Sequence, residues 1–283
     1  MKLKLCFILL VLLNFHLLCF AQDKIIWLQY NRPPWTIPYG EYKNQGYADK
    51  IRTFLTTNYL KEYKHSVLPV NPSRAMKIIN EENNKLCYGP TFKTESISKN
   101  FHYSKPMYVL PQARIIVTNQ VYEKLNGIQT ISMLDLIQDK NYIFGNVKAL
   151  YLYPIDLEKF IQEKNVITLS SSSPIRSLLQ MMRRNRIDWI YDYNVFIKWE
   201  TFLNKDYSNT LKTIKVKETK NLPLSVTYIA CSKNSFGKEI IDRINKKLTQ
   251  EDILEFRKEI RKWQLDENTI QSFDKLNKDF FGY

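Results

Sequence analysis

The chain has 283 residues, of which 44% are hydrophobic and 25% are charged, and its formal net charge at pH 7 is +14. The hydrophobic content excludes an intrinsically disordered chain, and a total of only 7 glycines disfavours a glycine-rich nucleotide-binding loop. The basic residues are scattered without a dense block, which argues against nucleic acid as a partner. Two interpretations of the charge remain, a solvated surface or the attraction of anions.

Residues 1–21 predict an export signal that is removed. Two lysines near the start are followed by an apolar run from Leu5 to Phe20, and we expect cleavage after Ala21. A membrane anchor is the alternative, but it needs about 20 apolar residues, and Asn14 and His16 interrupt this shorter run. We therefore expect a periplasmic or secreted protein with no stable membrane insertion after cleavage.

Strand and helix patterns alternate in the first part of the mature chain. Strands are predicted at residues 25–30, 65–70 and 85–88, and helices at residues 47–59 and 72–79. This order is typical of βαβ units and a parallel sheet. Ligands of such sheets bind beyond the carboxyl ends of the strands.

The same alternation restarts near residue 114. Strands are predicted at residues 114–117, 142–145, 188–193 and 225–231, and helices at residues 132–138, 174–182, 240–248 and 253–260. Three arginines, Arg183, Arg184 and Arg186, follow the helix that starts at Pro174. They either complement the negative end of the helix dipole or form a phosphate site.

Only two cysteines, Cys87 and Cys231, remain after removal of the signal. In an oxidising compartment they can form a disulfide, and two separate buried thiols are the alternative. No spacing of a zinc site surrounds them.

Several segments in this order resemble a known family. They are Tyr30–Trp35 after the first strand, Gly46–Asp49 at the first helix, Lys93–Glu95 followed by Phe101–Tyr108, Ile131–Leu136, and Asn185–Asp188. Together they resemble the extracellular solute-binding proteins of family three, which are clamshell proteins that present amino acids and related solutes to ABC transporters. The resemblance covers nearly the whole mature chain.

The resemblance implies an α/β fold of two lobes, each a mostly parallel sheet flanked by helices. Lobe I would contain residues 23–113 and 228–283, and lobe II residues 114–227, with hinge strands near Arg114 and Thr227. In that arrangement Cys87 and Cys231 lie on neighbouring strands of lobe I, which favours the disulfide.

Two departures from the family pattern bear on the ligand. The arginine that holds an amino acid's carboxylate in the family is replaced here by Ile97, which cannot make a charge-assisted contact. The aspartate that holds the ammonium would fall at Tyr193, with Asp192 one place earlier. We therefore expect a solute other than a standard α-amino acid.

The remaining candidate ligand-binding residues are aromatic, cationic and hydroxylic. We expect Trp35 and Tyr30 to stack on the solute, and Arg74 or Lys93 to replace the missing arginine. Hydroxyl contacts are expected from Thr91 and Thr94, and further contacts from Asp192 and Tyr193. Core packing, surface ion pairs and turn capping are the structural alternatives for these side chains.

The leading hypothesis is a monomeric protein that binds a small solute for uptake by an ABC-type permease, with no cofactor, no metal and no catalysis. An enzyme of the dehydratase or lytic type on the same fold is one alternative, although its candidate residues are few: His65, His102 and Glu95. The others are a scaffold that has lost binding and a cationic adhesive protein, which would need the basic clusters that this chain lacks.

Overall fold

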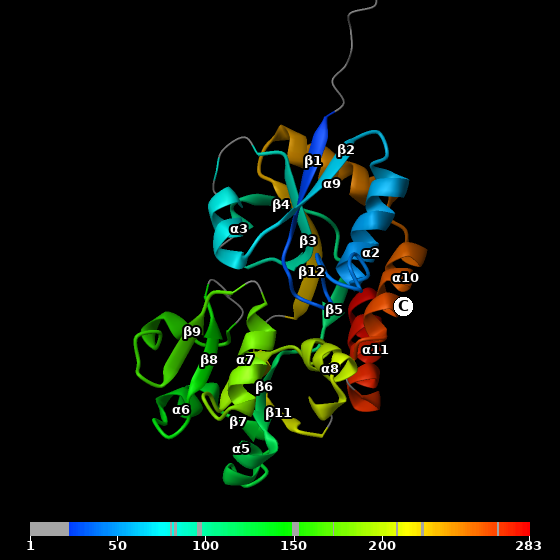
Figure 1. The fold of residues 1–283 in the computed structure, drawn as a ribbon. Coiled ribbons are helices and arrows are strands. Elements are labelled where there is room, and N and C mark those ends of the chain that lie inside the picture. The colour runs from blue at the N-terminus through cyan, green and yellow to red at the C-terminus, as the bar shows by residue number, and fades with distance from the viewer. Residues whose placement is uncertain are drawn as a thin grey trace, which may run out of the picture.

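The computed structural model describes residues 23–79, 81, 84–94, 98–148, 153–171, 173–207, 209–221, 224–264 and 266–283. The described elements form two lobes, each built on its own six-stranded sheet (Figure 1). The predicted export signal lies outside the described residues, as do Glu95 and Ile97. No helix among the described residues is long and apolar enough to cross a membrane.

The sheet of lobe I has the strand order β2-β1-β3-β12-β4, and β5 also pairs with β12. Its strands are β1 (Lys24–Gln29), β2 (Lys64–Pro69), β3 (Leu86–Phe92), β4 (Phe101–Tyr103), β5 (Tyr108–Leu110) and β12 (Ser225–Ser232). β1 is parallel to β2 and β3, whereas β12 is antiparallel to β3, β4 and β5. The sheet is therefore mixed rather than mostly parallel, because β12 returns from lobe II in the opposite direction.

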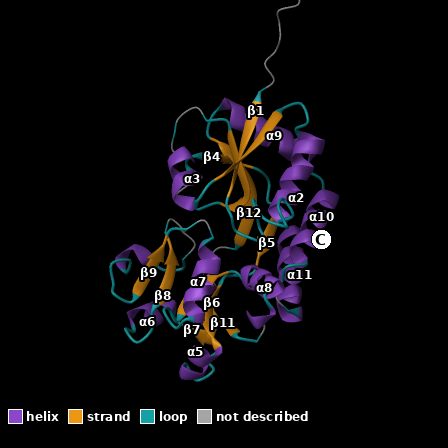
Figure 2. Cartoon of the chain, in the orientation of Figure 1, coloured by secondary structure: helices purple, strands orange, loops and turns teal. Residues whose placement is uncertain are grey.

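The helices of lobe I cover both sides of this sheet. They are α2 (Tyr47–Phe54), which continues as the π-helical turn η1 (Leu55–Tyr59), α3 (Pro72–Ile79), α9 (Ser235–Lys247), α10 (Gln250–Arg261) and α11 (Glu267–Phe281). Figure 2 shows α2, α10 and α11 on one flank and α3 on the other. Asn277 of α11 is fully buried and bonds both the N–H and the C=O of Val109, each at 2.8 Å, so the last helix is fixed to β5.

The sheet of lobe II has the strand order β7-β11-β6-β10-β8-β9. Its strands are β6 (Arg114–Thr118), β7 (Thr130–Ile131), β8 (Phe144–Val147), β9 (Val166–Leu169), β10 (Trp189–Asp192) and β11 (Leu211–Val216). Its helices are α5 (Asn119–Lys124), α6 (Met133–Gln138), α7 (Pro174–Arg183) and α8 (Asn194–Leu203), with short 3₁₀ turns η2 (Leu157–Lys159), η3 (Lys205–Tyr207) and η4 (Lys217–Asn221). β8 begins two residues later than predicted, since the N–H of Ile143 donates to the Asp188 carboxylate instead of to a neighbouring strand.

Cys87 and Cys231 face each other on the neighbouring strands β3 and β12 and are joined by a disulfide in the structure. Both side chains are fully buried in the core of lobe I. The bond links two strands that are 144 positions apart in the sequence.

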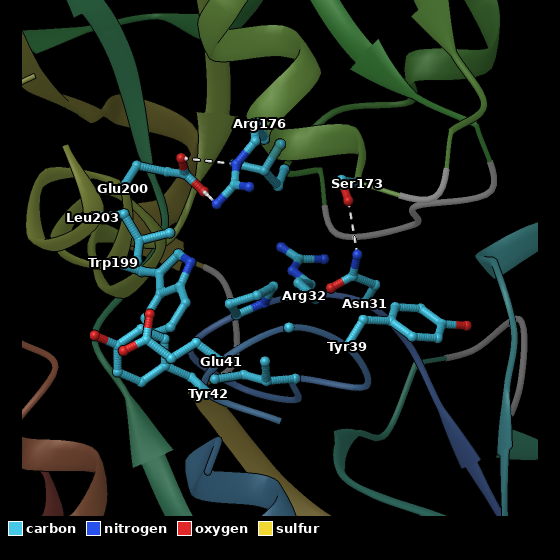
Figure 3. Close-up of a pocket in the computed structure, with 14 residues that line it drawn as sticks. Asn31, Arg32, Tyr39, Glu41, Tyr42, Ser173, Arg176, Trp199, Glu200 and Leu203 are labelled. Carbon is cyan, nitrogen blue, oxygen red and sulfur yellow. Dashed lines mark hydrogen bonds and ion pairs between the residues drawn. The ribbon is translucent and has the colours of Figure 1, made fainter. Parts of the chain in front are cut away.

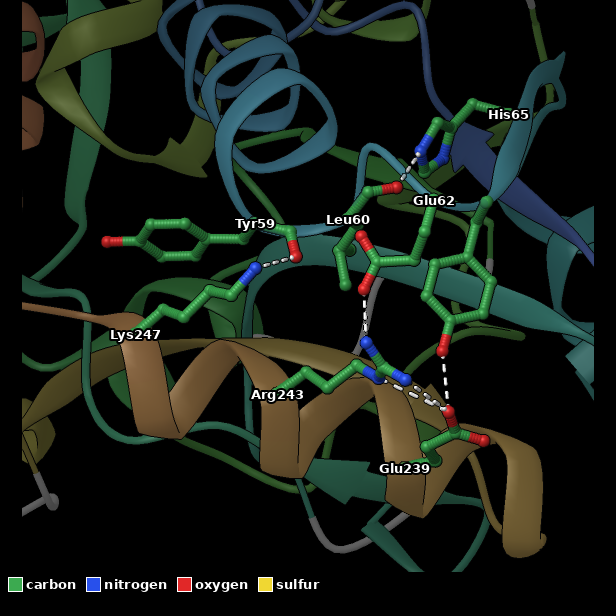
Figure 4. A network of polar contacts seen from close by, with 8 residues as sticks. Tyr59, Leu60, Glu62, His65, Glu239, Arg243 and Lys247 are labelled. Carbon is green, nitrogen blue, oxygen red and sulfur yellow. Dashed lines mark hydrogen bonds and ion pairs between the residues drawn. The ribbon is translucent and has the colours of Figure 1, made fainter.

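A polar network joins the end of η1 to α9 (Figure 4). Arg243 forms ion pairs with Glu62 and Glu239, and Tyr63 donates to Glu239 at 2.6 Å. Lys247 donates to the carbonyl of Tyr59 at 2.7 Å. These contacts fix α9 against the outer end of lobe I, far from the second lobe.

His65 belongs to the same end of lobe I. Its Nδ1 accepts from the Trp27 indole at 3.2 Å, and its Nε2 lies 2.9 Å from the carbonyl of Leu60. Both ring nitrogens are therefore engaged inside the lobe.

Candidate functional site: the cavity between the lobes

The loop between β1 and α2 is held in place by Asp49. This fully buried carboxylate accepts from the Gln29 amide at 2.6 Å and from the N–H of Ile37 at 2.8 Å, and it pairs with Arg52 at 3.0 Å. A Cβ on Gly46 would lie 2.4 Å from the carbonyl oxygen of Trp35, so only glycine fits there. The loop that carries residues 30–46 is thus fixed to lobe I at several points.

Arg32 extends from this loop into lobe II. Its guanidinium lies 2.5 Å from Oδ1 of Asp192, at the carboxyl end of β10, and 4.2 Å from the ring centroid of Phe196 on α8. The side chains of Arg32 and Asp192 are 12% and 1% exposed, so the pair is shielded from solvent. The N–H of Tyr193 also donates to Oδ1, at 2.8 Å.

Other contacts join the lobes on either side of this ion pair. Asn31 donates to the hydroxyl of Ser173 at 2.7 Å, as Figure 3 shows. The rings of Phe92 and Tyr193 stack with centroids 5.4 Å apart, and the Tyr193 hydroxyl lies 3.3 Å from that of Ser225. The two lobes are therefore closed on each other in this structure.

An aromatic cluster extends the closed interface along α8. Trp199 packs against Tyr42 of the lobe I loop, with ring centroids 5.6 Å apart, and against Trp263 after α10, at 5.2 Å. Phe202 contacts Tyr42 at 5.7 Å and Trp263 at 5.7 Å. Lobe II thus packs against the C-terminal part of lobe I as well as against the loop.

A cavity of about 480 Å³ lies between the lobes (Figure 3). Its lining includes Asn31, Arg32 and Tyr42 from lobe I and Arg176, Trp199 and Glu200 from lobe II. Arg176 makes two contacts with Glu200, at 3.3 and 3.4 Å. A second cavity of about 550 Å³ adjoins it on lobe II and is lined by Arg176, Gln180, Arg183, Arg184 and Tyr207 among others.

Burial changes the acidity of the two carboxyls beside the first cavity. It raises the pKa of Asp192, while the Arg32 guanidinium and the Tyr193 N–H act in the opposite direction. Burial also raises the pKa of Glu200, and Arg176 opposes that change. Oδ2 of Asp192, Nε of Arg32 and the indole nitrogen of Trp199 are buried without a hydrogen-bond partner in the described part of the chain.

The aromatic residues expected to stack on a solute lie in the core of lobe I. Trp35 is 8% exposed and packs edge-on against Tyr30 and Tyr88, with centroids 5.9 and 5.7 Å apart. Burial raises the pKa of Tyr30 to about 12. Neither Trp35 nor Tyr30 lines the cavity between the lobes.

The expected cations and hydroxyls of lobe I also lie away from this cavity. Arg74 is exposed on α3, and the ammonium of exposed Lys93 lies 5.6 Å from the ring centroid of Tyr103. Thr91 is buried on β3, and the carbonyl of Thr94 accepts from the N–H of Ser98 at 2.8 Å. Among the expected residues of lobe II, Asp192 bonds Arg32 and Tyr193 packs on Phe92, so these two lie at the interface of the lobes.

None of the residues that line the cavity was predicted from the sequence as a ligand-binding residue. The spacing of Val195, Phe196 and Trp199 is that of an apolar helical face, so it could have predicted α8. Arg32 and Asn31 carry no such signal, because they stand in an irregular loop before two prolines.

Two α/β lobes that are connected by two crossings of the chain and enclose a cavity define a clamshell fold. No family model and no curated protein matches the sequence. The comparison with solved structures does find similar folds.

The amino acid ABC transporter substrate-binding protein AbpA from Streptococcus pneumoniae, bound to L-arginine, is similar with a TM-score of 0.59 and 17% identity, over 92% of this chain and 95% of that one. An ABC uptake transporter substrate-binding protein from the same species, with bound histidine, gives a TM-score of 0.63 and 12% identity over 84% and 91% of the two chains. A Salmonella typhimurium periplasmic binding protein with high arginine specificity gives a TM-score of 0.59 and 13% identity, over 84% of this chain and 98% of that one.

These similarities confirm the predicted two-lobed α/β fold class, with a mixed rather than mostly parallel sheet in lobe I, and, at the level of the fold, the resemblance to family-three binding proteins. The chain has the two-lobed α/β fold of amino-acid ABC substrate-binding proteins.

Proposed function

We propose that this protein is an exported solute-binding protein that captures a small solute between its two lobes and delivers it to an ABC-type transporter. The observation that carries the proposal is the cavity of about 480 Å³ whose walls come from both lobes. A solute in that position contacts both lobes at once, so its binding energy favours the closed form. A membrane partner can then distinguish the closed, solute-bound form from the open form.

The lining of the cavity supports a solute without a large net charge. Two cations, Arg32 and Arg176, are balanced by two carboxyls, Glu41 and Glu200. Trp199 supplies an aromatic surface, and its buried indole N–H has no partner among the described residues. We expect a neutral solute with an apolar part and a hydrogen-bond acceptor rather than a standard α-amino acid, because Asp192, the buried carboxylate beside the cavity, is already paired with Arg32.

We propose binding without catalysis. His65 on β2 and His102 on β4 both lie in lobe I and do not line the cavity. Burial and the nearby Lys233 and Lys238 lower the pKa of His102, which favours its neutral form. Among the described residues no cluster of three metal-ligating side chains occurs.

The experiment is a thermal-shift screen of the mature chain against amino acids, small carboxylates, polyamines, aromatic acids, sugars and muropeptide fragments, followed by calorimetry. A solute at a hundred times its dissociation constant adds about 2.7 kcal/mol of stability. For a chain of this size that raises Tm by roughly 5–10 °C.

Two arginine variants locate the site. Arg176→Ala removes a cation from the cavity lining, and we expect it to weaken binding of the solute at least tenfold. Arg74→Ala, at an exposed arginine on α3, is the matched control and should leave the affinity unchanged. If Arg74→Ala weakens binding and Arg176→Ala does not, the solute binds beside Arg74 instead. Stabilisation by no compound would contradict solute binding, and turnover of a compound would show an enzyme.

A further inference from the structure

Asp192 and Phe196 form a site for a cation on lobe II. The carboxylate is almost completely buried at the end of β10, and the ring of Phe196 lies beside it on the first turn of α8. A carboxylate next to an aromatic face attracts a planar guanidinium or an ammonium. The carboxylate forms a charge-assisted hydrogen bond with the cation, and the aromatic ring attracts the cation through its quadrupole. In this structure the occupant is the chain's own Arg32, at 2.5 Å from the carboxylate and 4.2 Å from the ring centroid.

The occupant comes from the other lobe. Arg32 and Asp192 are 160 positions apart, and Arg32 stands in the loop that Asp49 holds against lobe I. Contact between them therefore requires the lobes to be closed. Because the guanidinium is tethered, its effective concentration at the site is in the millimolar range or above, and a free cation must exceed that to displace it.

Each member of the Arg32–Asp192 ion pair can form one more hydrogen bond. Oδ2 of Asp192 and Nε of Arg32 are both buried without a partner among the described residues. Arg32 also lines the cavity between the lobes, whereas Asp192 is not part of that lining. Removal of the Arg32 side chain would therefore open a path from the cavity to the carboxylate.

We propose that Arg32 is an internal ligand of lobe II. Its guanidinium fills the cation site of Asp192 and Phe196, stabilises the closed form in the absence of a solute, and excludes solutes that would place an ammonium or guanidinium group there. This inference rests on the proposed solute-binding function and names the specificity-determining residue of that site.

The test is chemical rescue of Arg32→Ala with methylguanidinium, which has the shape and charge of the missing group. We expect the variant to have a lower Tm than the wild type and to regain Tm in a saturable way with millimolar methylguanidinium. The wild type should not respond at the same concentrations. Arg261→Ala, which removes an arginine from an exposed ion pair with Asp274 and leaves no buried carboxylate unpaired, is the matched control and should not respond either.

The double variant Arg32→Ala/Asp192→Asn shows whether the carboxylate is the partner. It lacks the buried unpaired charge, so it should be more stable than Arg32→Ala and should not respond to methylguanidinium. If Arg32→Ala is recovered folded only when refolded with methylguanidinium, that supports the proposal. Equal responses in the wild type, in Arg261→Ala or in the double variant would overturn it.

Small-angle scattering gives a second measurement that needs no physiological solute. The ligand-free wild type should be compact, Arg32→Ala should have a larger radius of gyration, and methylguanidinium should return it to the compact value. A compact Arg32→Ala without the probe would overturn the role in closure. Failure of the solute screen would leave these results unaffected, so the two proposals can fail separately.

Discussion

At the scale of single residues, one buried carboxylate organises the loop that reaches the second lobe. Asp49 has no exposed surface and joins β1, the loop and α2 through Gln29, Ile37 and Arg52. An unpaired charge in such a position is costly, and each of its partners would lose a hydrogen bond if the carboxylate were removed.

We expect Asp49→Asn to lower the free energy of unfolding by about 3 kcal/mol. The neutral amide cannot form an ion pair with Arg52, and its NH₂ group would face N–H groups that now donate to the carboxylate. Urea unfolding measures this change. Asp274→Asn is the control, since it removes only the exposed ion pair with Arg261 and should cost less than about 1 kcal/mol. Equal losses in the two variants would contradict the role assigned to Asp49.

At the scale of elements, the short helix α6 is capped by a side chain from a distant segment. The carboxylate of Glu218, in η4, accepts from the Ser132 hydroxyl at 2.7 Å and from the N–H groups of Met133 and Leu134, both at 3.0 Å. Burial alone raises the pKa of Glu218, but these hydrogen bonds outweigh it, and the pKa lies below its ordinary value. An anion at a helix N-terminus is stabilised by the unpaired N–H groups there.

We expect Glu218→Gln to be less stable than the wild type by about 1 kcal/mol at neutral pH. Because the folded pKa is lowered, this stabilisation is present above the unfolded pKa and is lost as the pH falls through the folded pKa. The difference between wild type and variant should therefore disappear in acid, as urea unfolding across a pH series would show. Glu123→Gln, at an exposed position on α5, should show no such difference, and a pH-independent gap for Glu218→Gln would contradict the assignment.

At the scale of the whole molecule, the chain leaves lobe I after β5 and returns to it through β12, which lies in the middle of that sheet. The disulfide between Cys87 and Cys231 joins the returning strand to β3. It closes a loop that contains all of lobe II, so the unfolded chain loses much of its freedom when the bond is present.

We expect the double variant Cys87→Ala/Cys231→Ala to lose about 2–5 kcal/mol of stability relative to the oxidised protein. Treatment of the wild type with a reductant during unfolding should lower its stability by a similar amount. Thiol labelling of the denatured, unreduced mature chain should find no free cysteine. Two labelled thiols would instead support the alternative of separate buried cysteines.

The elements that the sequence predicted well are those whose signal is local. The buried run of β1 and the apolar stripe of α3 are found within a residue or two of their expected positions. Each is a short segment in which the apolar residues follow one pattern, that of a buried strand or that of a helix. α11 was not predicted, since its buried side chains, Phe273 and Asn277, include a polar residue whose partner is on β5. Burial of that asparagine depends on a contact that local spacing does not contain.

The candidate site depended even more on contacts between distant segments. Asp192 could be named from the resemblance to the family's motif, but its partner Arg32 lies in the other lobe and has no pattern that links the two. Trp35 was expected at the ligand, and in the structure its ring packs against Tyr30 and Tyr88 in the core of lobe I. An aromatic residue after a strand can serve either purpose, and only its neighbours distinguish them.

By itself, the sequence determined the alternation of strands and helices, the two-lobed class and the strands that carry Cys87 and Cys231, because hydrophobic period and motif order are properties of the chain. The tertiary structure decided which side chains meet between the lobes. Arg32 reaches Asp192 only when the two lobes close on each other, and that geometry depends on the packing of residues more than a hundred positions apart.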